Sequence, residues 1–189
     1  DSLIGAALHD TLEGGDGADI LIGGAGSDLF VADMADTITD SAGQDTLRAT
    51  ENFVLAAGLA IEVLEAQGSA GNISLFGNTL AQTILGNSGA NFLHGGAGAD
   101  TINGGTGRDT GSYLLSGAAV LVNLNGAGQA GGHAQGDLLA SIEQLQGSIF
   151  ADTLIGRSTA HVGLNSNDEH RGEAGNDRIE DIVGQNTLL

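Results

Sequence analysis

Residues 14–31 read GGDGADILI followed directly by GGAGSDLFV, which are two tandem copies of one nine-residue unit. Residues 95–112 repeat the pattern as GGAGADTIN and GGTGRDTGS. The unit has glycine at places one, two and four and aspartate at place six, and in three of these four copies place eight is apolar. Glycine readily adopts the backbone conformations of a tight turn, and one apolar residue in a short alternating segment indicates a strand with one inward side chain. Each unit is therefore predicted to form a turn followed by a three-residue strand.

The same nine-residue frame extends outward from these copies and divides the chain into three arrays and two connectors. The first array covers residues 5–40, the second residues 77–112, and a third, weaker one residues 147–183. The connectors, residues 41–76 and 113–146, contain alternating apolar segments that indicate further strands. Both also carry an Ile-Glu-x-Leu segment shortly before the next array. We therefore expect the connectors to continue or cap the repeat structure.

Two units side by side are expected to make one coil of 18 residues, with a strand on each side. Neighbouring coils would stack about 4.8 Å apart, so that their strands pair in parallel and their apolar residues form a thin core. The predicted fold class is all-β, a parallel β-roll in the form of one elongated right-handed β-solenoid over residues 1–189. Because a single coil cannot bury its apolar side chain, stability must come from stacking and from whatever fills the turns.

The turns also have the chemistry of a cation site. Their backbone carbonyls can point at one spot, and the aspartate adds a carboxylate there; oxygen-only sites of this kind suit Ca²⁺. Without the ion, facing aspartates would repel each other, and a glycine-rich backbone costs about 1–2 kcal/mol per residue to order. The sequence therefore predicts several bound calcium ions and a chain that folds when they bind.

The unit G-G-x-G-x-D-x-apolar-x, matched in full at residues 14–22, 23–31 and 95–103, resembles the calcium-binding nonapeptide of the repeat-in-toxin (RTX) family. The resemblance implies a parallel β-roll in which calcium lies between the turns of adjacent coils, held by aspartates and by the carbonyls of the glycine turns. It also implies a bacterial protein that is exported by type I secretion with an uncleaved C-terminal signal. The end of the chain, from residue 181 on, is a candidate for that signal.

The resemblance further implies which residues bind calcium. Place-six residues two units apart would face each other: Asp10 with Asp28, Asp19 with Asp36, Gln82 with Asp100, and Asn91 with Asp109. The neutral members of the second array put full occupancy there in doubt. The complete set of implied ligands comprises place-six residues and turn glycines: Asp10, Gly15, Gly17, Asp19, Gly24, Gly26, Asp28, Asp36, Asn91, Gly96, Gly98, Asp100, Gly105, Gly107, Asp109, Asp152, Gly175 and Asp177.

Composition limits the partners. The chain has 24 acidic and five basic residues and a formal charge of −19, which would repel nucleic acids and anionic membranes and attract cations. It has no cysteine for a disulfide. No apolar run approaches the roughly 20 residues that span a bilayer, and the first residues, from Asp1 to Ile4, do not have the pattern of a signal peptide. We therefore expect no nucleic acid partner, no membrane span, and either a protein exported without a cleaved leader or a fragment of a larger one.

Signals for catalysis are weak. The one G-x-G-x-x-G match, at residues 126–131, lacks the strand and helix of a nucleotide site, and no two histidines have metalloprotease spacing. We therefore expect no enzyme but a calcium-binding module that supports secretion and structure of a bacterial exported or cell-surface protein. Two alternatives remain open. One is a self-associating surface-layer or adhesin component that forms homo-oligomers through its solenoid; the other is the C-terminal module of a secreted enzyme whose catalytic domain lies outside this chain.

Overall fold

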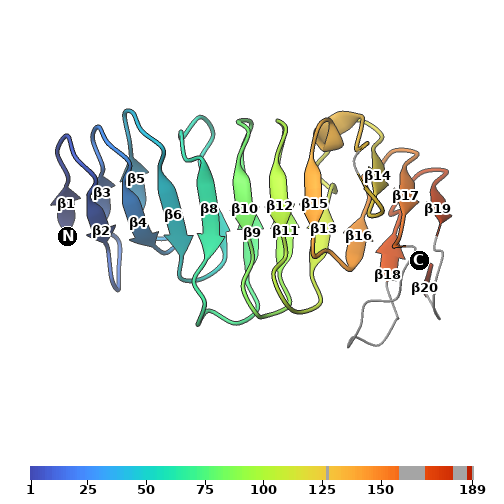
Figure 1. Ribbon diagram of the computed structural model, residues 1–189, viewed down its shortest axis with the longest axis horizontal. Coiled ribbons are helices and arrows are strands. Elements are labelled where there is room, and N and C mark those ends of the chain that lie inside the picture. The colour runs from blue at the N-terminus through green and yellow to red at the C-terminus, as the bar shows by residue number, and fades with distance from the viewer. Residues whose placement is uncertain (127, 158–168, 181–186, 189) are drawn as a thin grey trace.

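Short parallel strands, separated by turns, are stacked in one row along the long axis of the molecule (Figure 1). The computed structural model describes residues 1–126, 128–157, 169–180 and 187–188. In these ranges the strands are two to four residues long, and the only helix is a 3₁₀ turn, η1 (Gly132–Ala134). The predicted all-β class is confirmed, and the parallel pairing agrees with a β-roll.

Two long sheets run along the row, and each contains seven strands. The first follows the order β15 (Leu138–Ala140), β12 (Thr101–Asn103), β10 (Thr83–Leu85), β8 (Val63–Ala66), β6 (Thr46–Ala49), β4 (Leu29–Ala32) and β2 (Thr11–Glu13). The second follows the order β20 (Thr187–Leu188), β18 (Glu169–Arg171), β16 (Gln144–Gln146), β13 (Thr110–Ser112), β11 (Phe92–His94), β9 (Ser74–Phe76) and β7 (Phe53–Val54).

Two shorter sheets of three strands each complete the fold. One contains β1 (Ser2–Ile4), β3 (Ile20–Ile22) and β5 (Thr37–Thr39), near the N-terminal end of the row in Figure 1. The other contains β14 (Leu121–Asn123), β17 (Thr153–Ile155) and β19 (Arg178–Glu180), near the C-terminal end. Strands that are consecutive in the chain therefore belong to different sheets, as the alternation of two units per coil predicts.

The strand register measures the length of each coil. Hydrogen-bonded place-six residues are 18 apart from Asp10 to Asp28, which agrees with the predicted coil. The next step in the same row, from Asp28 to Asp45, spans 17 residues, and the step from Asp100 to Asp137 spans 37. The coil of 18 residues is thus the common case and not a constant, because turns can lose one residue or accept a long insertion without breaking the strand ladder.

Both connectors take part in the stacked sheets. Strands β6 to β9 come from residues 41–76, and β14 to β16 come from residues 113–146. The apolar residues of successive coils lie in register and form a buried ladder through the first long sheet: Leu12, Phe30, Leu47, Leu64, Ile84 and Ile102. Burying one such side chain contributes roughly 1.5–3 kcal/mol, so the thin core gains its stability coil by coil.

Residues 40–48 form a repeat unit that the sequence pattern placed in the connector. The segment reads DSAGQDTLR, and its Asp45 and Leu47 occupy places six and eight. Leu47 is fully buried and pairs with Phe30 of the preceding coil. The first array therefore continues past residue 40, with an aspartate at place one and a serine at place two where most units have glycine.

Candidate metal centre

Place-six residues of successive coils are linked directly by hydrogen bonds. The backbone N–H of Asp10 donates to Oδ1 of Asp28 at 2.8 Å, and that of Asp19 donates to Oδ1 of Asp36 at 3.0 Å. The N–H of Asp28 in turn donates to Oδ1 of Asp45 at 2.8 Å. The structure thus brings together the partners predicted for the first array and adds Asp45 to the row.

The second array repeats this arrangement. The N–H groups of Gln82 and Asn91 donate to Oδ1 of Asp100 and Asp109, at 2.8 and 2.7 Å. Both aspartates then bond to a residue of the second connector in the same way, Asp100 to Oδ1 of Asp137 at 2.9 Å and Asp109 to Oε2 of Glu143 at 2.9 Å.

In the third array the two predicted residues also meet, since the N–H of Asp152 donates to Oδ1 of Asp177 at 2.9 Å. Each row is thus a line of acidic side chains in which one carboxylate oxygen is already bound by the backbone of its neighbour.

The turn glycines take the backbone conformation that the motif predicts. All the glycines implied as ligands have positive φ: Gly15, Gly17, Gly24, Gly26, Gly96, Gly98, Gly105, Gly107 and Gly175. The requirement is clearest at Gly26, where φ is 136° and an added Cβ would lie 2.7 Å from the carbonyl carbon of Leu8 in the preceding coil. These turns therefore stack closely because they have no side chains at places two and four.

The second carboxylate oxygen of five buried aspartates has no hydrogen-bond partner. Oδ2 of Asp19, Asp28, Asp45, Asp100 and Asp109 is buried without a hydrogen bond, and each of these residues is at most 3% exposed. A buried carboxylate oxygen without a partner is costly unless a cation or a proton reaches it. These oxygens therefore fit a cation between the turns.

The glycine at place one keeps the space next to these oxygens open. A Cβ added at Gly14 would lie 2.7 Å from Oδ2 of Asp36 and 3.2 Å from Oδ2 of Asp19. The corresponding Cβ at Gly23 would lie 2.5 Å from Oδ2 of Asp28. Since real Cβ atoms do not approach so closely, these positions must stay free of a side chain. The donor set consists of hard oxygen atoms, which is the set that Ca²⁺ prefers.

Burial also raises the pKa of two of these carboxyl groups, those of Asp100 and Asp109. The loss of solvent raises the pKa of Asp100 to about 7, and nearby Asp137 adds to the shift. Burial likewise raises the pKa of Asp109 to about 6, with a contribution from Glu143. Protons and cations therefore compete for the same oxygens.

Three carboxylates gather where the first array continues past its predicted end. Asp28, Asp40 and Asp45 each have an oxygen within 4.8 Å of the other two. Burial, followed by the charge of Asp45, raises the pKa of Asp40 to about 6. The sequence pattern missed Asp40 and Asp45 because their unit lacks the first two glycines, although Gly43 at place four and Leu47 at place eight could have revealed the frame.

The acidic residues of the Ile-Glu-x-Leu segments were also missed. Glu62 accepts a hydrogen bond from the N–H of Asp45 at 2.8 Å, as Glu143 does from Asp109. The likeness between the two connectors thus has a structural reason: a glutamate continues the acidic row where a coil has no place-six aspartate.

Three turns have a different chemistry, in which the protein itself supplies the partners. Oδ1 of Asn91 accepts from the N–H of Asn87 at 2.8 Å, and its Nδ2 donates to Oδ1 of Asn87 at 3.1 Å. Gln82 and Asn78 form an equivalent pair, in which Nε2 donates to Oδ1 at 2.8 Å. In these two turns an amide takes the place of a carboxylate, so the implied role of Asn91 as a calcium ligand does not fit its contacts.

The third such turn contains Asp152. Its Oδ2 accepts from the backbone N–H of Ser148 at 2.5 Å, and the Ser148 hydroxyl donates to both carboxylate oxygens, at 2.9 and 3.0 Å. A serine at place two thus satisfies the carboxylate that is left open in the glycine turns. Asp152 has its predicted neighbour Asp177, but its oxygens fit a cation less well than those of Asp100 or Asp109.

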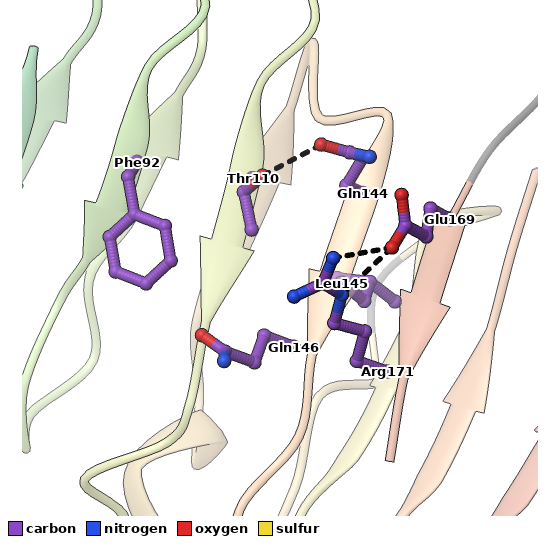
Figure 2. A pocket seen from close by; sticks show the side chains of 7 residues that line it. All are labelled: Phe92, Thr110, Gln144, Leu145, Gln146, Glu169 and Arg171. Carbon is purple, nitrogen blue, oxygen red and sulfur yellow. Dashed lines mark hydrogen bonds and ion pairs between the residues drawn. The ribbon is translucent and has the colours of Figure 1, made fainter. Parts of the chain in front are cut away.

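A separate hollow of about 210 Å³ lies over β11, β13, β16 and β18 (Figure 2). Figure 2 shows two hydrogen-bonded pairs among its side chains: Thr110 donates to Oε1 of Gln144 at 3.0 Å, and Arg171 donates to Glu169 at 2.9 Å. None of the residues implied as calcium ligands lines this hollow. It is therefore distinct from the acidic rows.

Comparisons with known proteins agree with the geometry of the turns. No helix in the described part of the chain is long and apolar enough to cross a membrane. A search of curated proteins finds no significant match to the chain. Residues 4–34 and 76–110 match the family model of the RTX calcium-binding nonapeptide repeat, in four copies. These two stretches are similar to the calcium-binding repeats of the RTX family.

Proposed function

We propose that this module folds when several calcium ions bind to its acidic rows outside the cell, and that it thereby supports the export and structure of a bacterial secreted or cell-surface protein. The observation that carries the proposal is the set of buried Oδ2 atoms without partners on Asp19, Asp28, Asp100 and Asp109. A bound cation would neutralise the charge of these carboxylates, and the carbonyls of the neighbouring turns would complete its coordination. Its absence would leave them buried and repelling one another.

The energetics favour calcium as a folding switch. An ion that binds only the folded state, at ten times its dissociation constant, stabilises that state by RT ln 11, roughly 1.4 kcal/mol per site. Extracellular sites of this class bind at about 10⁻⁴ to 10⁻³ M, far above the calcium level inside a cell and close to that outside. Because several such sites stabilise the same stack, the folded fraction would depend sharply on the calcium concentration although each site binds weakly.

Circular dichroism during a calcium titration from excess chelator tests the proposal. We expect little β signal without calcium, a cooperative rise at about 10⁻⁴ to 10⁻³ M, and no comparable rise with Mg²⁺, which prefers a smaller octahedral site and loses its waters reluctantly. A full β signal in chelator would overturn the proposal.

We further propose that the module itself is not an enzyme. The support is that its acidic side chains bind neighbouring coils. Along each row, the carboxylate of one coil accepts a hydrogen bond from a backbone N–H of the coil before it. The two other roles predicted from the sequence, self-association and service to a catalytic domain, remain predictions. Light scattering with and without calcium tests the first, and the sequence of the full-length protein tests the second.

A further inference from the structure

Asp40 stands where the repeat normally has no side chain at all. It occupies place one of the unit formed by residues 40–48, whereas units 14–22 and 23–31 have glycine there. The place-one glycine lies beside the open carboxylate oxygens described above. An aspartate at this place therefore brings a third carboxylate to a turn that otherwise has two.

The contacts show where that carboxylate points. A Cβ added at Gly23 of the preceding coil would lie 2.5 Å from Oδ2 of Asp28 and 2.5 Å from Oδ1 of Asp40, so both oxygens border the same small space. Asp45 belongs to the same group, since each of the three residues has an oxygen within 4.8 Å of the others.

Each of the three carboxylates has at least one buried oxygen without a hydrogen-bond partner. Asp28 and Asp45 are 2% and 1% exposed, and Oδ2 of both is buried without a hydrogen bond. Both carboxylate oxygens of Asp40 are also buried without one. The charged groups that act on Asp40 are Asp45 and Asp28, which are both acidic. Nearly complete burial of two unsatisfied carboxylates, aimed at a third, points to a cation as the missing partner.

We propose that Asp40, with Asp28 and Asp45, forms a three-carboxylate cation site that is the tightest calcium site of the chain and that prefers trivalent lanthanide ions to calcium more strongly than the other turns do. The inference rests on the calcium-dependent function proposed above. Its physical basis is charge: affinity in oxygen sites rises with the number of charged ligands. Two carboxylates match a divalent ion, whereas three leave a net negative charge that only a trivalent ion removes.

The test compares the wild-type chain with Asp40→Asn, which keeps the shape and removes the charge, and with Asp40→Gly, which restores the usual residue. Asp16→Asn is the matched control, because Asp16 is an exposed turn residue of the same array. Calcium is titrated against a chromophoric chelator, and terbium is then titrated into the calcium-loaded protein with direct excitation of its luminescence.

In the wild type we expect one calcium site that is tighter than the rest and is the first to exchange for terbium. Both Asp40 variants should lose at least tenfold in the affinity of that site and in its preference for terbium, with the weaker sites unchanged. Asp16→Asn should change each value less than twofold. Circular dichroism at saturating calcium shows that the variants still fold; if Asp40→Asn does not, Asp40→Gly decides the test.

Two results would overturn the proposal, and they are distinguishable. If the wild type binds calcium and folds while both Asp40 variants bind all ions within twofold of it, then Asp40 is a protonated neighbour and not a ligand, and the proposed function stands. If the wild type binds no calcium, the proposed function fails and the three-carboxylate site fails with it.

Discussion

At the scale of single residues, the glycines of this chain have two separate uses. At places two and four they permit a positive φ, as at Gly26. At place one they leave room for carboxylate oxygens, as at Gly23. Gly111 has neither use: it replaces the inward apolar residue of β13, and a Cβ there would make an ordinary contact of 3.4 Å with Cγ2 of Ile142.

Alanine substitutions should therefore have opposite effects at Gly23 and Gly111. At Gly23 the new Cβ would lie 2.5 Å from Oδ2 of Asp28 and 2.7 Å from Cζ of Phe30, and we expect a loss of about 1–3 kcal/mol of stability. At Gly111 alanine adds core contact and restricts the unfolded chain, so we expect a gain of about 0.4–1 kcal/mol. Urea unfolding in saturating calcium measures both, and equal effects of the two variants would contradict this division of roles.

The raised pKa values of Asp100 and Asp109 predict an unusual response to pH when calcium is absent. In the folded chain these carboxyls keep a proton up to pH values of about 7 and 6, whereas in the unfolded chain they lose it near 4. Between those values the folded state binds more protons, so the free energy of unfolding falls as pH rises, by at most about 1.4 kcal/mol per pH unit and group.

We therefore expect more β signal in calcium-free buffer at pH 5 than at pH 8. With subsaturating calcium the trend should reverse, because protons displace the cation from the same oxygens. Asp100→Asn should weaken both trends. A calcium-free β signal that grows from pH 5 to pH 8 would contradict the assignment.

At the scale of the elements, the repeat pattern predicts the turn and strand of each unit because both follow from a few local residues. Gly15, Gly17 and Asp19 each fix one local feature, and the structure places all three as expected. The partners Asp137 and Glu143 were not predictable in this way. They come from an insertion, with sequence separations of 37 and 34 residues to their hydrogen-bonded neighbours, and no fixed period relates them to the array.

The unit at residues 40–48 escaped prediction for another physical reason. It has an aspartate and a serine at places one and two, and the step from Asp28 to Asp45 is 17 residues, so both the glycine pattern and the period of 18 fail there. Likewise, the repeat pattern implies that Asn91 is a calcium ligand, whereas its hydrogen bonds with Asn87 are an alternative way to hold the turn. The residue types alone do not distinguish a turn that has lost its calcium site from a turn in which side-chain hydrogen bonds replace the ion.

The amide turns should make some elements less dependent on calcium than others. Strands β10 and β11 follow turns held by Asn78 with Gln82 and by Asn87 with Asn91, whereas β3 and β4 follow turns with unpaired Asp19 and Asp28 oxygens. Hydrogen exchange at decreasing calcium should therefore show protection lost first in β3 and β4 and last in β10 and β11.

Asn91→Asp is the matched test of that order, because it restores the carboxylate of the repeat. It should make β11 lose protection at higher calcium than in the wild type, while β3 and β4 stay unchanged. Simultaneous loss of protection in all four strands of the wild type would show that the stack responds to calcium only as a whole.

At the scale of the whole molecule, the formal charge of −19 raises the question of whether calcium acts at specific sites or merely reduces repulsion. Reduced repulsion concerns the exposed carboxylates, whereas specific binding concerns the buried ones. Exposed carboxylates such as that of Asp16 are screened by any salt, whereas the unpaired oxygens of Asp19, Asp28, Asp100 and Asp109 are buried and bulk salt does not reach them.

Sodium chloride should therefore fail to replace calcium. At about 1 M the Debye length is about 3 Å, so repulsion between exposed charges is almost removed, but the buried oxygens still lack a cation. We expect small-angle scattering to show an expanded chain in chelator with about 1 M NaCl and a rod-like particle with about 10 mM CaCl₂ at low salt. If NaCl alone gave the rod, general screening and not ion binding would order the chain. Since about 10 mM CaCl₂ at low salt screens charges far less than about 1 M NaCl does, a rod that forms only with calcium requires the ion at the buried oxygens themselves.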